Sequence, residues 1–169
     1  MGHKIIVERG YLRFSAAHFI TFGGKCERLH GHNYTISVGL EGDLTTDAYL
    51  FDFVALKDIA RHVCEALDHR ILLPSHNEHL TLREGENEWE VLFQEQRYLF
   101  PARDVLVLPV DNITAERLAE YICGQIKEEL TGQVTGHIET IVVGVEESPG
   151  QTAFYRERFA QGTGATLEG

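Results

Sequence analysis

Positive charge, cysteine and long apolar runs are all scarce in this sequence, and each scarcity excludes a class of protein. The 169 residues include 15 Lys and Arg against 26 Asp and Glu, which gives a formal net charge of −11 at pH 7. A chain this acidic is a poor candidate for binding nucleic acid or an anionic membrane surface. No apolar run approaches the roughly 18 residues that a membrane-spanning helix needs. We therefore expect neither a nucleic acid nor a membrane as a partner.

The three cysteines are too few for a disulfide framework in a chain of this size. Residues 1–10 contain no apolar core of a secretory signal, so we expect a cytoplasmic protein. Repeats and low-complexity linkers are also lacking. With 43% hydrophobic residues, the composition predicts one domain over residues 1–160, large enough to bury a core without metal or disulfides. Residues 161–169 are small and polar, which predicts a flexible tail.

Alternation of apolar and polar residues with a period of two predicts four strands. They cover about residues 4–19, with a break near Gly10, and about residues 30–41, 138–147 and 152–159. On the second of these strands, one face begins with His30 and His32 and continues with apolar side chains. This strand is therefore expected to be half-buried, with two histidines at one end of its apolar face.

Apolar residues at helical spacing predict two helices, over about residues 52–67 and 114–130. Asp52 is a suitable N-cap for the first helix, and Asn112 or Thr114 for the second. The order of strands and helices predicts an α+β fold.

Two further features belong to the core and to the middle of the chain. Cys64 and Cys123 lie at or beside the apolar stripes of the two predicted helices, so we expect them in the core. Between the helices, alternating large apolar side chains from Trp89 to Phe93 predict an extra, hairpin-like insertion within about residues 74–109.

Nine histidines are more than this composition would suggest, and their placement carries most of the functional signal. His30 and His32 are two positions apart on a strand, so both imidazoles point the same way and can reach one metal ion. His18 lies at the end of the neighbouring predicted strand. Three neutral imidazoles without a fourth protein ligand are typical of a catalytic zinc ion. Taken alone, the His30–His32 pair is explained as well by hydrogen bonds to backbone carbonyls; His18 and the neighbouring Cys26 favour the metal.

Cys26 lies four residues before His30 in a glycine-rich loop, with Lys25 and Arg28 beside it. A thiol close to cations and a metal ion tends towards the thiolate, which can serve as a base or nucleophile. We therefore expect a lowered pKa for this thiol. A fourth metal ligand and an unreactive loop thiol are the two alternatives.

Two carboxylates complete the candidate site. Asp68 and His69 directly follow the first predicted helix, and a histidine beside a carboxylate suits a proton relay. Glu147 ends an apolar strand face just before a turn, where a carboxylate could accept two N–H groups of a flat heterocycle. The plainer alternatives are a decorated helix end and a solvated strand end.

Several motifs now occur together in one order. Phe14-Ser-Ala-Ala-His18 precedes Cys26-Glu-Arg-Leu-His30-Gly-His32-Asn-Tyr34. After them come Phe51-Asp52-Phe53, Leu67-Asp68-His69, Asn112-Ile-Thr114-Ala-Glu116 and Glu147-Ser-Pro. Over about residues 4–159, this pattern resembles the 6-pyruvoyl-tetrahydropterin synthase and 6-carboxy-tetrahydropterin synthase family. The Cys-x3-His-Gly-His segment with an upstream histidine is quite specific, whereas each later motif is weak alone.

The resemblance implies the tunnelling fold, in which a subunit has a four-stranded antiparallel sheet with two helices on one face. In the family, subunits join into trimeric barrels, and two barrels stack into a homohexamer with active sites between subunits. Residues 74–109 depart from the compact bacterial members, and Ser148 stands where threonine is more usual.

Roles for individual residues follow from the same resemblance. The implied ligands of Zn²⁺ are His18, His30 and His32. Cys26 is implied to be the general base, with Asp68 and His69 as a catalytic relay that reaches it from a neighbouring subunit. The residues implied to hold the pterin are Glu147, which anchors the ring, Thr114 and Glu116.

The resemblance also implies 7,8-dihydroneopterin triphosphate as the substrate. We favour 6-carboxy-5,6,7,8-tetrahydropterin as the product, with release of acetaldehyde and triphosphate on the way to queuosine, because residues 24–32 look bacterial. The 6-pyruvoyl product of biopterin synthesis is the alternative within the class. A zinc-binding assembly protein without turnover and an aldolase acting on dihydroneopterin also stay open.

Overall fold

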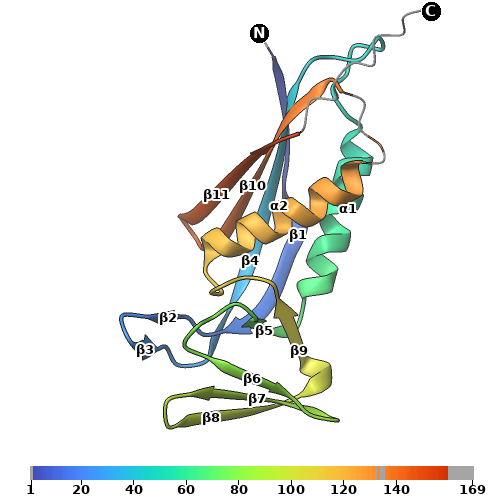
Figure 1. The fold of residues 1–169 in the computed structure, drawn as a ribbon. Coiled ribbons are helices and arrows are strands. Elements are labelled where there is room, and N and C mark those ends of the chain that lie inside the picture. The colour runs from blue at the N-terminus through green and yellow to red at the C-terminus, as the bar shows by residue number, and fades with distance from the viewer. Residues whose placement is uncertain (1, 132, 134–135, 160–169) are drawn as a thin grey trace, which may run out of the picture.

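The computed structural model describes residues 2–131, 133 and 136–159, and the expected tail over 161–169 lies outside them (Figure 1). Its main sheet has six strands in the order β11-β10-β4-β1-β5-β9. The first four are antiparallel neighbours and agree with the predicted strands to within one or two residues. They are β1 (His3–His18), β4 (His30–Gly42), β10 (Ile138–Ser148) and β11 (Gln151–Arg158).

The prediction of a sheet with only four antiparallel strands was wrong. Strands β5 (Arg70–Pro74) and β9 (Val105–Leu108) extend the sheet beyond β1, and both pair in parallel. Each is a short apolar run without alternation, which fits a helix segment or a loop as well as a strand. Only the long connection between them, which the local pattern does not reveal, allows their parallel pairing.

Strand β1 is continuous, although the sequence predicted a break near Gly10. The ladder between β1 and β4 shifts register between Glu8 and Arg13, and Gly10 lies inside this shift with a φ of 69°. The glycine therefore marks an irregularity within one strand, since such bulges favour a residue that tolerates positive φ.

Helices α1 (Phe53–Leu67) and α2 (Ala115–Thr131) lie together on one face of the sheet (Figure 1). Their apolar stripes pack on the inward side chains of β1, β4 and β10, and the predicted core residues Cys64 and Cys123 are buried there. Among the described residues, neither helix is long and apolar enough to cross a membrane.

The middle region forms the predicted hairpin and adds a third strand to it. Its three antiparallel strands are β6 (Thr81–Glu84), β7 (Glu88–Phe93) and β8 (Gln96–Pro101), and a 3₁₀ turn (Ala102–Asp104) leads on to β9. The inward side chains of this sheet form a second core with Phe19 at the end of β1. The small sheet lies beside the two-stranded hairpin of β2 (Thr21–Phe22) and β3 (Lys25–Cys26) (Figure 1).

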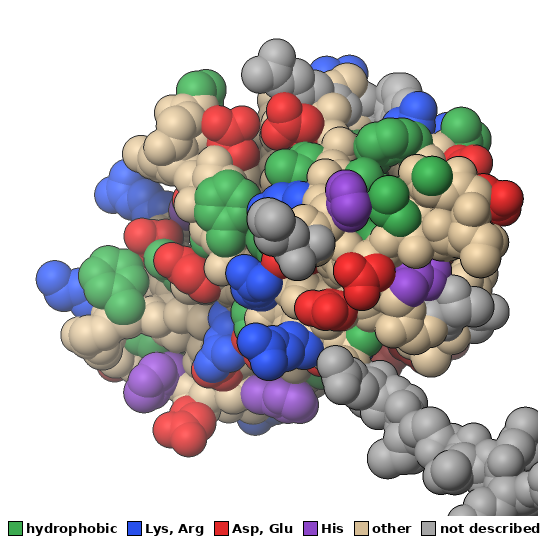
Figure 2. Space-filling view, turned by 90° about the horizontal axis from the view of Figure 1, so that it is seen from above, with side chains coloured by type: hydrophobic (Ala, Val, Ile, Leu, Met, Phe, Trp, Pro, Cys, Tyr) green, Lys and Arg blue, Asp and Glu red, His purple; other side chains and the backbone are tan. Residues whose placement is uncertain are grey.

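The loop before α1 and the start of that helix expose several apolar side chains. Tyr49, Phe53 and Val54 are 50%, 51% and 60% exposed. Figure 2 shows the molecule from above, with apolar side chains standing between acidic and basic ones. This end of the molecule therefore has a mixed surface rather than a field of one sign.

The N-cap of α1 was predicted correctly and provides a test of the fold. Asp52 Oδ1 accepts hydrogen bonds from the backbone N–H of Val54 at 2.6 Å and of Ala55 at 3.0 Å. The substitution Asp52→Ala should therefore lower the free energy of unfolding by about 1 kcal/mol, as for other lost N-caps. Urea denaturation measures this change.

A control for this substitution lies on the same helix. Within the described part of the chain, Asp58 forms an ion pair with Arg61 alone, and both side chains are about half exposed. Asp58→Ala should cost less than about 0.5 kcal/mol, because exposed ion pairs contribute little. Equal losses for the two variants would contradict a capping role for Asp52.

Candidate functional site

Three predicted histidines meet at one end of the β1–β4 pair. His18 ends β1 and lies opposite His30, while His32 lies opposite Ala16, so all three imidazoles share one face of the sheet. One ring nitrogen from each histidine lies within 4.8 Å of the other two. The predicted triad is therefore assembled within a single chain.

Backbone carbonyls set the orientation of two of these rings. His18 Nδ1 lies 2.7 Å from the carbonyl oxygen of Ile113, and His30 Nδ1 lies 2.8 Å from that of Arg28. A carbonyl only accepts hydrogen bonds, so each Nδ1 carries a proton and each Nε2 keeps its lone pair. Metal-binding histidines are held in the same way in other proteins. From the sequence alone, such hydrogen bonds to carbonyls were an alternative to a metal site. In the structure they orient the rings as a metal site requires.

The protonation of His18 suits a metal ligand. Burial lowers the pKa of His18, and the neighbouring His30 and His32 lower it further, against the effect of its hydrogen bond to Ile113. The neutral imidazole that results is the form that binds metals. Three imidazole nitrogen donors fit Zn²⁺, although they would also suit other divalent transition metals.

Glu147 reaches the triad from strand β10. Its Oε1 atom lies 3.6 Å from His18 Nε2 and 3.7 Å from His32 Nε2, and its side chain is only 27% exposed. The hydroxyl of Tyr34 donates a hydrogen bond to the same oxygen at 3.3 Å. Glu147 is therefore a fixed member of the site rather than a solvated strand end.

Tyr34 is a member of the site that sequence reasoning assigned to the apolar face alone. Its ring is buried and stacks on Phe14, with the ring centroids 4.8 Å apart. Burial raises its pKa, and the adjacent Glu147 raises it further, so the hydroxyl keeps its proton and can donate. Its position on the His30–His32 face was visible in the sequence, but its partner lies 113 residues away.

A pocket of about 470 Å³ opens over the triad. Its walls include the start of α2, where the Thr114 hydroxyl accepts a hydrogen bond from the Arg117 backbone N–H at 3.3 Å and so caps the helix. Six of the predicted site residues line this pocket, namely His18, His30, His32, Thr114, Glu116 and Glu147.

Cys26 does not line this pocket, but its neighbour Glu27 does. Neighbouring residues in an extended segment point to opposite sides, and the Cys26 side chain packs against the second core. Burial raises the pKa of the Cys26 thiol, and Glu27 raises it further. The expected lowering by Lys25 and Arg28 was wrong, because both cations are exposed to solvent and burial dominates.

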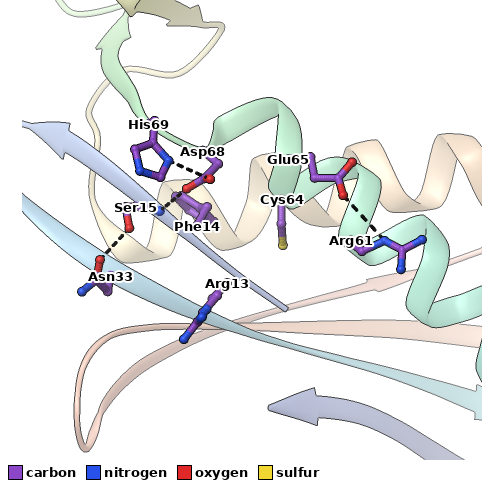
Figure 3. Close-up of a pocket in the computed structure, with 9 residues that line it drawn as sticks. All are labelled: Arg13, Phe14, Ser15, Asn33, Arg61, Cys64, Glu65, Asp68 and His69. Carbon is purple, nitrogen blue, oxygen red and sulfur yellow. Dashed lines mark hydrogen bonds and ion pairs between the residues drawn. The ribbon is translucent and has the colours of Figure 1, made fainter. Parts of the chain in front are cut away.

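Asp68 and His69 lie in a different pocket, of about 520 Å³ (Figure 3). Asp68 Oδ1 accepts a hydrogen bond from the Ser15 backbone N–H at 2.7 Å, and Oδ2 lies 2.8 Å from His69 Nδ1. None of the triad histidines lines this pocket. The carboxylate–imidazole pair is therefore formed as predicted. Together with His32 of the triad, His69 also lines a further pocket of about 470 Å³, but Cys26 lines neither of the two pockets that His69 lines.

Comparison with known proteins identifies related sequences and structures. The sequence model of a family described as 6-pyruvoyl tetrahydropterin synthase matches residues 7–158. A Methanocaldococcus jannaschii protein, provisionally named a 6-carboxy-5,6,7,8-tetrahydropterin synthase, is 34% identical over 147 residues, which is 86% of this chain and 90% of the relative. A dihydroneopterin monophosphate aldolase of Pyrococcus furiosus is 39% identical over 59 residues, covering 35% of this chain and 50% of the relative.

Solved structures of the same family resemble this chain over nearly its whole length. The 6-pyruvoyl tetrahydropterin synthase of Plasmodium vivax superposes with a TM-score of 0.90 at 33% identity, covering 94% of this chain and 99% of that one. Variants of the same enzyme, in which a glutamate named as a catalytic residue is replaced by alanine or cysteine, superpose with a TM-score of 0.89.

The hydrogen bonds of Asp68 predict a pH dependence of stability. The Ser15 backbone N–H lowers the pKa of this carboxyl below its ordinary value of 3.8, against the effect of desolvation, and His69 lowers it further. As the pH falls, the unfolded chain therefore takes up this proton first, and the contribution of Asp68 to stability is lost below about pH 4.

The variant Asp68→Asn isolates this effect. In metal-free protein it should be less stable than the wild type near neutral pH, and the difference should shrink as the pH falls below about 4. Urea denaturation of both proteins at several pH values measures the difference. A gap that stays the same from neutral to acid pH would contradict the assignment.

Proposed function

Because the chain belongs to the 6-pyruvoyl tetrahydropterin synthase family, we propose that it is a zinc-dependent lyase acting on 7,8-dihydroneopterin triphosphate. The products are 6-carboxy-5,6,7,8-tetrahydropterin, acetaldehyde and triphosphate, in a cytoplasmic pathway to queuosine. The observation that carries this proposal is the histidine triad beside Glu147 in one pocket. The name of the Methanocaldococcus jannaschii relative supports the carboxy product over the pyruvoyl one.

The three histidines would hold Zn²⁺ through their Nε2 atoms. When bound there, the ion acts as a Lewis acid that makes a proton on the substrate side chain easier to remove. The carbonyls of Ile113 and Arg28 keep two of the rings oriented for this task.

Glu147 is proposed to anchor the pterin ring. A carboxylate can accept two parallel N–H donors from a flat heterocycle, and the Tyr34 hydroxyl holds one of its oxygens in place. Thr114 and Glu116 line the same pocket at the start of α2 and are proposed as further contacts of the pterin.

Cys26 is proposed as the general base, and Asp68 with His69 as the pair that exchanges the proton with it. Cys26 lines neither of the two pockets that His69 lines, which supports a relay that reaches it from a neighbouring subunit. His69 is 81% exposed in one chain, which leaves its ring free to face a neighbouring subunit.

The sheet edge supports assembly with further copies. Strand β11 ends the main sheet, and Phe154 on this strand is 67% exposed. An exposed edge strand invites pairing with another chain, and closure into a barrel removes such edges. We therefore propose that subunits join into trimeric barrels and that two barrels form a homohexamer.

Incubation of the zinc-loaded protein with 7,8-dihydroneopterin triphosphate, followed by mass spectrometry, tests the proposed reaction. We expect 6-carboxy-5,6,7,8-tetrahydropterin and acetaldehyde. In Cys26→Ala, kcat should fall by about 100-fold or more, the usual cost of losing a general base, with the zinc content unchanged. Cys123→Ala, which removes a buried thiol of α2, is the matched control and should keep its activity.

Two other results would redirect the proposal. A 6-pyruvoyl product would leave the site assignments in place and move the reaction to biopterin synthesis. Bound zinc without any consumption of the triphosphate would instead favour a non-catalytic zinc-binding assembly protein.

A second candidate function rests on Glu27. This carboxylate lines the triad pocket, whereas Cys26 does not. A base there could take the proton of a side-chain hydroxyl of dihydroneopterin monophosphate. The neighbouring C–C bond then breaks, glycolaldehyde phosphate leaves, and the carbon that keeps the electron pair on the pterin side takes up the proton. The name of the Pyrococcus furiosus relative supports this candidate. The Plasmodium vivax synthase supports only the use of a glutamate as a catalytic residue in a structurally similar protein.

Substitution of the two neighbouring residues separates the two activities. Glu27→Gln should reduce aldolase turnover by about 100-fold and leave conversion of the triphosphate nearly unchanged. Cys26→Ala should show the reverse pattern. Chromatography of the pterin products from each substrate measures both rates, and a requirement for one residue in both reactions would rule out this division.

A further inference from the structure

Cys26 lies on a hairpin that is too short to be stable by itself. Strands β2 and β3 have two residues each, and the turn between them is Gly23-Gly24, with φ values of 54° and 75°. Isolated two-stranded hairpins are marginally stable even when longer. The position of the Cys26 thiol therefore depends on what the hairpin contacts.

Thr21 is the cross-strand neighbour of Cys26. Its own N–H and carbonyl point away from β3 and meet the Asn112 side chain, which accepts from Thr21 N at 3.2 Å and donates to Thr21 O at 2.8 Å. The Asn112 side chain thus satisfies both backbone hydrogen-bonding groups of Thr21, as a neighbouring strand would. It also lies directly before Ile113, whose carbonyl orients His18.

The chain between β5 and β6 holds the side chain of the same threonine. Asn77 Nδ2 donates hydrogen bonds to Thr21 Oγ1 at 2.8 Å and to the carbonyl of Asp111 at 2.6 Å. At the tip of the hairpin, Gln94 Nε2 donates to the carbonyl of Gly24 at 3.4 Å. One residue before the small sheet and one in its β7–β8 turn thus contact the hairpin.

The second core supports the hairpin from below. Phe19 is buried and stacks on Tyr98 of β8, with the ring centroids 5.3 Å apart and the planes 22° from parallel. Cys26 packs against this same cluster. The thiol and the ring stack therefore share one packed environment, which the middle region of the chain provides.

We infer that Asn77 and Tyr98 are positioning residues, which fix the Cys26 hairpin beside the triad pocket through Thr21 and Phe19. The middle region then helps to position Cys26, in addition to extending the fold. The effect on turnover rests on the proposed function, whereas the effect on the Cys26 thiol does not.

The reaction of the thiol with iodoacetamide tests this inference directly in the zinc-loaded protein. In Asn77→Ala and Tyr98→Ala, the hairpin opens more often, so alkylation of Cys26 should become about fivefold faster. The kcat for the triphosphate should fall about tenfold with KM nearly unchanged, because small misplacements of a reacting group are costly. Peptide mass spectrometry assigns the labelled cysteine, and circular dichroism verifies folding.

Three controls accompany the two variants. Tyr98→Phe keeps the ring stack and should behave like the wild type. Arg97→Gln removes an ion pair with Glu90 on the exposed face of the small sheet and should also change neither rate. Cys64 and Cys123 are buried in the main core and should stay unlabelled throughout.

Two results would overturn the inference. One is an unchanged alkylation rate in both alanine variants while they remain folded. The other is faster labelling of Cys64 and Cys123 together with Cys26, which would indicate general loosening instead of a positioned hairpin. A protein that does not turn over the triphosphate would refute the proposed function, and the alkylation rates alone would then decide the inference.

Discussion

Antiparallel pairing of β1 with β4 places His18 opposite His30 and Ala16 opposite His32, and the remaining parts of the site are arranged around this register. A slip of one residue would turn either His18 or the His30–His32 pair to the other face of the sheet. The same register buries Tyr34 and Ile36 under the two helices. The hydrophobic core therefore favours the same pairing of strands that brings the three histidines together.

Groups from distant parts of the chain then complete what the two strands begin. The Ile113 carbonyl, just before α2, orients His18. Glu147 of β10 lies beside the triad and accepts a hydrogen bond from the Tyr34 hydroxyl. These contacts join both ends of the chain at one pocket. The Asp68–His69 ion pair lies at the end of α1 and lines another pocket. Under the proposed function, the pair would meet Cys26 only where two subunits join.

The middle of the chain has a structural and a functional consequence. Its small sheet forms a second core with Phe19 and Val105, and this core adjoins β5 and β9 of the main sheet. Cys26, at the end of the β2–β3 hairpin, packs against this second core. The Cys26 and Glu27 side chains therefore meet different surroundings, an apolar cluster for the thiol and the open pocket for the carboxylate.

Local patterns in the sequence determined much of this protein. The period of two predicted the four antiparallel strands and the shared face of His30 and His32, and helical spacing predicted α1, α2 and the Asp52 cap. These features depend on neighbours along the chain, which is why they could be predicted. Tertiary structure alone decided the parallel pairing of β5 and β9, the Tyr34–Glu147 contact and the surroundings of Cys26. Each of these joins segments far apart in sequence. Burial raises the pKa of the Cys26 thiol despite the nearby Lys25 and Arg28, and this burial exists only once those segments have packed.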